Sequence, residues 1–68
     1  MKHVTGKRMC RALELRGWVL DRVKGSHHIY REPNHQFPVS VPVHGNKTLK
    51  PGTQRAIMRA AGLTDDDF

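Results

Sequence analysis

The sequence contains little of what stabilises secreted or membrane proteins. Its 68 residues include one cysteine, Cys10, so no disulfide can form within the chain. No apolar run approaches the roughly 18 residues of a spanning helix, which argues against an integral membrane protein. The first residues lack the apolar core of about 7–15 residues that a secretory signal has. We therefore expect one small cytoplasmic domain over residues 1–68, in which Cys10 is structural.

Acidic residues are scarce outside the C-terminal tail. Twelve Lys and Arg stand against six Asp and Glu, and three of the acids form an acidic tail at residues 65–67. Residues 1–64 thus hold twelve cations against three acids, an excess of nine. This excess favours a polyanionic partner such as nucleic acid, because neutralising phosphates releases counterions. Thr64 can cap a short turn in the tail, which otherwise frays.

The hydrophobic spacing predicts two helices with similar ends. The first spans residues 5–16, where Thr5 can cap its start and Gly17 can end it in a left-handed conformation. The second begins at Pro51, which suits the first turn of a helix, and runs to about residue 61 before Gly62. The residues predicted for its apolar stripe are Thr53, Ile57, Ala60 and Ala61.

Three runs between the helices alternate with the period of two that is typical of strands. Residues 18–23 and 26–31 flank a predicted hairpin turn. The third run, FPVSVPV at residues 37–43, contains two prolines, which indicate an edge strand. The order α-β-β-β-α predicts an α+β fold with a three-stranded antiparallel sheet. Two helices cover one face of this sheet, and the other face is open.

Two adjacent histidines follow the predicted turn, in the segment GSHHIY at residues 25–30. Successive side chains of a strand point to opposite faces, so His27 and His28 are expected to diverge. Tyr30 is the largest apolar side chain of this strand and is expected to pack inward. His28 then shares the inner face, whereas His27 and Ile29 lie on the open face. We interpret Gly25 as the residue that gives the turn before His27 a backbone conformation that other residues rarely adopt.

The histidines are compatible with several kinds of site. A zinc site is disfavoured, because His27 and His28 diverge and no cysteine pair stands at ligand spacing. Ser26 beside His27 lacks a third triad residue at a recognisable spacing. RNA cleavage needs only a base, cations for the phosphate oxygens and a proton for the leaving oxygen, which one histidine among cations can supply. A non-catalytic nucleic-acid-binding module explains the charge equally well, and a protein-interaction domain for an acidic partner is a third interpretation.

The chain resembles the HicA family of toxins, also called YcfA-like, over residues 5–63. The segments that carry the resemblance are RGW at 16–18, RVKGSHHIYREP at 22–33, VPVH at 41–44, LKPGTQRAI at 49–57 and AGL at 61–63. Their order and spacing together make it specific. It implies a fold similar to double-stranded RNA-binding domains. It also implies a ribonuclease that cleaves mRNA without a metal or other cofactor, as the toxin of a type II toxin–antitoxin system.

The resemblance also implies which residues form the site. The functional histidine directly follows Gly-Ser, which is His27 here; His28 is the second choice, because relatives shift the histidine within this motif. His44 matches a further motif position and is interpreted as a phosphate contact, with the ordering of its loop as the alternative role. Loop position and charge, rather than the resemblance, add the lysines to the residues predicted to bind RNA or phosphate, which are Lys24, Ser26, His44, Lys47 and Lys50.

The family further implies a HicB-type antitoxin that covers the active surface. A basic open face suits an acidic, shape-matched partner. We expect the free chain to be a monomer and the complex with the antitoxin to be a hetero-oligomer, with no membrane involved.

Overall fold

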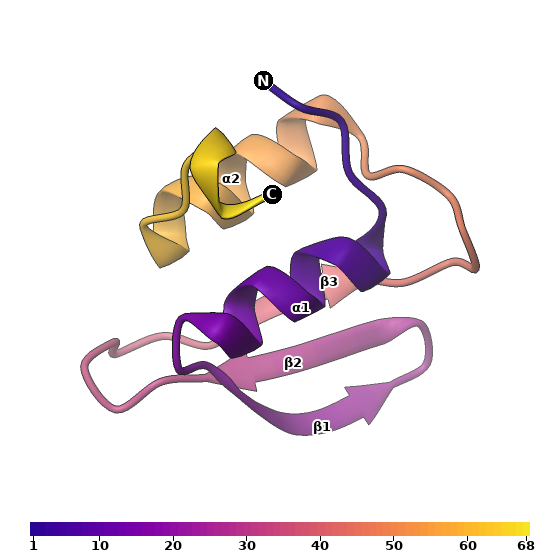
Figure 1. Ribbon diagram of the computed structural model, residues 1–68. Coiled ribbons are helices and arrows are strands. Elements are labelled where there is room, and N and C mark those ends of the chain that lie inside the picture. The colour runs from indigo at the N-terminus through magenta and orange to yellow at the C-terminus, as the bar shows by residue number, and fades with distance from the viewer.

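The computed structural model describes residues 1–68 and contains two helices, one sheet and a final 3₁₀ turn. In chain order the elements are α1 (Gly6–Leu15), β1 (Val19–Lys24), β2 (His27–Arg31), β3 (Val39–Pro42), α2 (Pro51–Ala61) and η1 (Asp65–Asp67). The strands form one antiparallel sheet in the order β1-β2-β3. Both helices lie on the same side of this sheet (Figure 1), so the predicted α+β architecture is confirmed. Neither helix is long and apolar enough to cross a membrane.

One apolar core lies between the sheet and the helices. It contains fourteen buried residues, to which the sheet contributes Tyr30, Val39 and Val41 and α1 contributes Met9 and Leu13. Each large side chain buried in this way stabilises the fold by about 1.5–3 kcal/mol. The helix-side face of the sheet is therefore the one that maintains the fold.

Both helices end as their glycines predict. Gly17 and Gly62 have φ angles of 91° and 71°, in the left-handed region that favours glycine. The backbone N–H of Trp18 donates to the carbonyl of Leu13, five residues back, at 3.0 Å. Leu63 makes the same bond at the end of α2, at 2.8 Å. These bonds satisfy carbonyls that the helix itself leaves free.

The buried side of α2 differs from the predicted stripe. Its buried residues are Gln54, Ile57, Met58 and Ala61, whereas Ala60 is exposed. The Gln54 side chain accepts a hydrogen bond from the N–H of Val4 at 3.1 Å and donates one to the carbonyl of Lys2. A glutamine thus replaces an apolar residue on this face, because its amide holds the N-terminal segment against the helix.

Close packing joins the start of α1 to the end of β3. A Cβ atom placed on Gly6 would lie 2.2 Å from the carbonyl oxygen of Pro42, so only glycine fits here. Just before α1, the carbonyl of Val4 accepts a hydrogen bond from the N–H of Leu49 at 2.8 Å. The N-terminal segment therefore fixes both the end of β3 and the loop at residues 43–50.

The sheet departs from the prediction at its margins. β3 is shorter than the predicted run of residues 37–43, and Phe37 lies exposed before it. As its prolines indicated, β3 is an edge strand. β1 contains a bulge between Leu20 and Arg22, where Asp21 has no partner on β2.

The acidic tail forms the capped turn rather than fraying. The Thr64 hydroxyl accepts a hydrogen bond from the Asp66 N–H at 3.3 Å, and the Asp67 carboxylate accepts one from the Thr64 N–H at 2.8 Å. Arg16, the residue directly after α1, donates two hydrogen bonds to the Asp67 carboxylate, at 2.7 and 3.1 Å. The hydrogen bond from the Thr64 amide lowers the pKa of Asp67 most, and the hydrogen bond from Arg16 lowers it further.

Candidate functional site

A two-residue turn presents the first of the paired histidines. Gly25 has a φ angle of 61° and Ser26 a negative one, which fits a type II′ hairpin turn with glycine at its first position. Lys24 and His27 are directly paired across this hairpin. The carbonyl of Ser26 accepts a hydrogen bond from the N–H of Val43 at 2.7 Å, which holds the turn against the end of β3.

The two histidines lie on opposite faces of β2. His27 is exposed, and its Nδ1 lies 3.1 Å from the Oγ of Ser40, within hydrogen-bonding distance. His28 is half-buried and pairs with Val23 on one side and Val41 on the other, on the face that Tyr30 shares. The alternation predicted from the sequence is therefore confirmed for the placement of both rings.

The exposed imidazole lies between a cation and the margin of a hollow. Lys24, His27 and Pro42 form one cross-strand row on the open face. Neighbouring strands lie about 4.8 Å apart, so Lys24 and Pro42 flank the imidazole closely. Arg22, Ile29 and Ser40 form a second row on the same face.

The hollow lies beyond β3 and has a volume of about 450 Å³. Its lining residues are Pro42, His44, Lys47, Thr48, Leu49, Lys50 and Thr53. The structure thus brings together His44, Lys47 and Lys50, three residues predicted to bind phosphate. Lys24 and Ser26 do not line the hollow; they lie on the hairpin side of His27.

The hollow also faces the start of α2. Lys50 is the residue at the N-cap, and its side chain makes no capping hydrogen bond. The first-turn amides of α2 therefore have no side-chain acceptor there, and the helix dipole adds positive potential. Lys47 is held in a turn by its N–H, which donates to the carbonyl of His44 at 3.0 Å. This arrangement is chemically suited to an anion.

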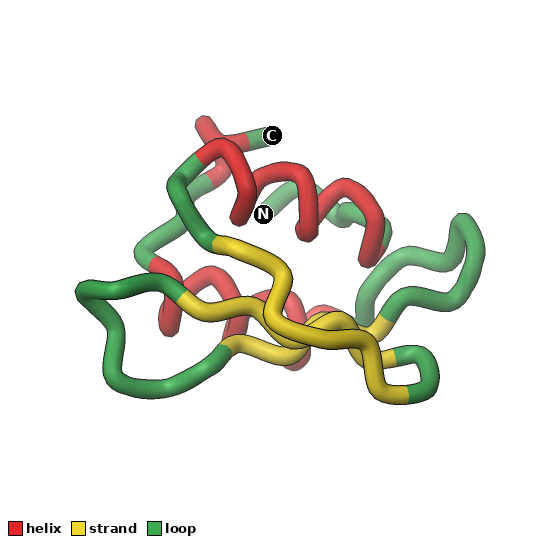
Figure 2. The backbone as a smooth tube through the Cα atoms, turned by 90° about the horizontal axis from the view of Figure 1, so that it is seen from below, coloured by secondary structure: helices red, strands yellow, loops and turns green.

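The hairpin turn and the loop at residues 43–50 lie at the same end of the molecule, as Figures 1 and 2 both show. Figure 2 also shows the loop at residues 32–38 at the opposite end of the sheet. The turn that follows Lys24 and the loop that carries Lys47 and Lys50 therefore lie at the same end of the sheet although they are far apart in the chain.

Three residues of the open face were missed by the sequence reasoning. Arg22 and Arg31 lie on this face by the same alternation that places His27, and that alternation could have identified them. Ser40 could have been placed outward because Val39 and Val41 point inward. Its contact with His27 depends on the register between β2 and β3, which the sequence did not predict.

Ile29 is on the open face, as predicted, but it is buried there. β2 is the central strand, so Ile29 is flanked on both sides, by Arg22 on β1 and Ser40 on β3. It does not belong to the main core and forms a small apolar floor beneath the polar groups.

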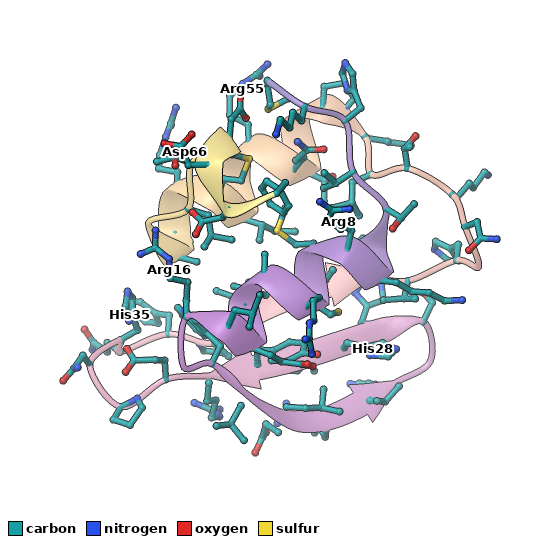
Figure 3. The ribbon with its side chains drawn as sticks, in the orientation of Figure 1. Arg8, Arg16, His28, His35, Arg55 and Asp66 are labelled. Atoms are coloured by element: carbon teal, nitrogen blue, oxygen red, sulfur yellow. The ribbon has the colours of Figure 1, made fainter.

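The other end of the sheet has a structural histidine. His35 stacks on Trp18 with ring centroids 4.7 Å apart and hydrogen-bonds to Glu32. This hydrogen bond from His35 is the main cause of the lowered pKa of Glu32. Figure 3 shows His28 near the hairpin end and His35 at the opposite end. Nowhere do three His, Cys, Asp or Glu side chains converge as metal ligands would.

A polar contact in the core anchors the strand that carries both histidines. The Tyr30 hydroxyl donates a 2.6 Å hydrogen bond to the Glu14 carboxylate on α1. Burial and this carboxylate raise the pKa of Tyr30 far above its usual value. Burial also raises the pKa of the neighbouring Cys10 thiol, which suits a structural cysteine rather than a reactive one. β2 is therefore held firmly against α1 from its inner face.

Comparison with known proteins gives a family for this fold and site. Residues 6–63 match the family described as "HicA toxin of bacterial toxin-antitoxin". No curated protein matches the chain. A toxin of such a system acts with an antitoxin partner, so the family implies one. The match covers most of the chain, which therefore belongs to the HicA toxin family.

Proposed function

We propose that this HicA toxin is a metal-independent ribonuclease that cleaves mRNA, and that His27 is its proton-transferring residue. The observation that carries the proposal is the position of the exposed His27 imidazole. It lies between Lys24 and a hollow that Lys47 and Lys50 line. A substrate phosphate at this point would contact an acid–base group and cations together.

The chemistry is a transesterification within the RNA strand. A base removes the proton of the 2′-hydroxyl, the 2′-oxygen forms a bond to phosphorus, and the bond from phosphorus to the 5′-oxygen breaks. The leaving 5′-oxygen takes a proton. The products are a 2′,3′-cyclic phosphate and a 5′-hydroxyl, with no water or redox partner consumed. His27 accepts the first proton or supplies the second, since an imidazole can do either near neutral pH.

The surrounding groups position the substrate and stabilise its charge. Lys24 would contact the scissile phosphate, and its pairing with His27 across the hairpin supports this role. Ser26 lies in the turn between them and can donate to a phosphate oxygen. His44, Lys47 and Lys50 would hold a flanking phosphate in the hollow. Ser40 keeps the imidazole oriented through its 3.1 Å contact with Nδ1.

His28 is the second choice for the catalytic group. Its ring is half-buried on the helix-side face, away from the row that contains Lys24. We assign it a packing role, because a strand cannot present both neighbours to one substrate atom.

The antitoxin is proposed to be of the HicB type and to cover the open face. It would bury the cations and the imidazole that RNA needs, which accounts for neutralisation by simple occlusion. We propose that the free toxin is a monomer, that the complex is a hetero-oligomer, and that both are in the cytoplasm with the mRNA.

The test is cleavage of a defined RNA by the purified protein in EDTA, with analysis of the product ends. Wild type should give cyclic-phosphate ends, and His27→Ala should cleave at least about 100-fold more slowly. His35→Ala serves as the matched control, because it removes an imidazole outside the site. Intact RNA, or an unchanged rate for His27→Ala, would overturn the proposal. Salt-dependent binding without scission would instead identify a nucleic-acid-binding module.

A further inference from the structure

The two edges of the sheet differ in their ability to accept another strand. Directly after β3, the N–H of Val43 points toward the hairpin, where it donates to the carbonyl of Ser26. Backbone groups alternate in direction along a strand, so the nitrogen of Pro42 points to the outer edge and offers no hydrogen there. Pro38 comes just before this strand and also lacks a donor. By the same alternation Ser40 keeps an outward N–H, but the prolines on either side of it lack one, so β3 is poorly suited to further pairing.

β1 lacks the proline-based protection that β3 has. It contains no proline, and all six of its residues are exposed. Lys24 is paired with His27 around a two-residue turn, so its backbone groups face β2 and those of Val23 face outward. The free edge of β1 thus presents unpaired backbone donors and acceptors.

Exposed apolar side chains lie along this edge on the helix side. Leu20 and Val23 are paired with Tyr30 and His28, which places them on the face that α1 covers. They nevertheless remain 43% and 51% exposed, because β1 lies at the margin of that covered area. A fourth strand would bury them and complete the layer under α1.

The open-face side of the same strand is positive. Arg22 and Lys24 are paired with Ile29 and His27, so both cations point to the open face. The acid of β1, Asp21, is already engaged by Arg22 at 2.6 Å and by Arg31 at 3.6 Å. A second copy of this chain, with its net charge of +6, would be repelled here. An acidic strand would be attracted.

We propose that the free edge of β1 binds an extended segment of an acidic partner protein as a fourth strand of the sheet. In this segment, apolar side chains toward Leu20 and Val23 alternate with acidic side chains toward Arg22 and Lys24. Main-chain hydrogen bonds supply affinity, and the alternating side chains supply specificity. The bulge at Asp21 limits regular pairing to a short segment.

The family implies an antitoxin, and this protein is the natural source of such a segment. A strand docked on β1 would lie about 4.8 Å from the strand that carries Lys24. It would lie two strand spacings from β2, which carries His27. The inference depends on the family and not on the proposed cleavage chemistry, so the two can fail separately.

The probe is a blocked ten-residue peptide of alternating Val and Glu, added to the ¹⁵N-labelled full chain. We expect NMR shifts at Leu20 and Val23 and at least tenfold slower exchange of their amide hydrogens. Val23→Pro removes the outward N–H and should abolish this protection, whereas Val23→Ala keeps the N–H and should lose little of it. A peptide of the same composition with its valines and glutamates in separate blocks should bind much more weakly.

A peptide with N-methylated valines tests the same hydrogen bonds without changing the protein, in case Val23→Pro does not fold. It should give no protection of β1. Three results would overturn the proposal: equal binding of the block peptide, shifts confined to Lys47 and Lys50, or undiminished binding of the N-methylated peptide. β1 amides that become protected with rising protein concentration and no peptide would also overturn it, in favour of a second copy. RNA cleavage is not a readout here.

Discussion

The helix-side face and the open face of the sheet are built from alternate residues of the same three strands. Tyr30, Val39 and Val41 are buried beneath the helices, whereas His27 and Ser40 are exposed on the other side. A step of one residue thus separates a group that maintains the fold from a group available to a substrate. Substitutions on the two faces should therefore affect different measurements, stability in one case and RNA processing in the other.

Gly6 is the position where this separation should break down. In Gly6→Ala the new methyl group would meet the Pro42 carbonyl, so α1 must move away from the strand that borders the hollow. We expect a loss of about 3 kcal/mol in the free energy of unfolding, measured by urea titration, and slower cleavage as well. Gly52→Ala is the control, because nothing lies within 4 Å of a Cβ there and alanine suits a helix. Equal stability of the two variants would contradict the close approach.

At the hollow beyond β3, removal of two cations should weaken RNA binding without unfolding the protein. For Lys47→Ala/Lys50→Ala we expect the slope of log K against log salt to decrease by about two. The unfolding midpoint should remain at the wild-type value, since both residues are exposed. Arg55→Ala/Arg59→Ala removes the same charge from α2 outside the hollow. An equal change in slope for this pair would show that RNA binding is not localised to the hollow.

On the helix side, Tyr30→Phe should lower the stability of the protein and leave its activity on RNA unchanged. The substitution removes the hydroxyl that donates to Glu14 and keeps the buried ring, so about 1 kcal/mol of stability should be lost. The RNA cleavage rate per folded molecule should stay the same. A fall in that rate with stability unchanged would place Tyr30 in the RNA site and contradict the division of faces.

The smallest effect is expected at the tail and should depend on pH. The pKa of Asp67 is lower in the folded chain, so the ionised carboxylate contributes stability above the ordinary aspartate pKa, and this contribution is lost as pH falls. Asp67→Asn should therefore melt below wild type at pH 7, and the difference should shrink as the pH falls through the ordinary aspartate range and vanish once the carboxylate is protonated in the folded chain. Asp66→Asn, which removes no ion pair, is the comparison. A difference that persists at low pH would indicate a cause other than charge.

Local sequence signals were sufficient for the elements and for the faces of β2. Thr5, Gly17, Pro51 and Gly62 mark helix ends through backbone requirements of single residues, and the structure has those ends. The alternation around His27 likewise depends only on the geometry of one strand. Such features need no knowledge of distant contacts.

The features that the sequence did not predict all depend on contacts between distant segments. Gln54 is buried because the N-terminal segment supplies its partners, about fifty residues away. Ser40 meets His27 through the strand register, and Phe37 is left outside β3 because pairing ends at Val39. The hollow exists because the N-terminal segment fixes the loop at residues 43–50. This contact joins distant parts of the chain, so no local sequence pattern predicts it.

The most direct test compares His27→Ala and His28→Ala side by side, with RNA cleavage in EDTA and urea unfolding measured on the same preparations. For His27→Ala we predict a loss of cleavage of at least about 100-fold with wild-type stability. For His28→Ala we predict cleavage within a few-fold of wild type and a loss of about 1 kcal/mol in stability. A folded His28→Ala protein that no longer cleaves RNA, beside an active His27→Ala, would contradict the account and transfer the catalytic role to the helix-side histidine.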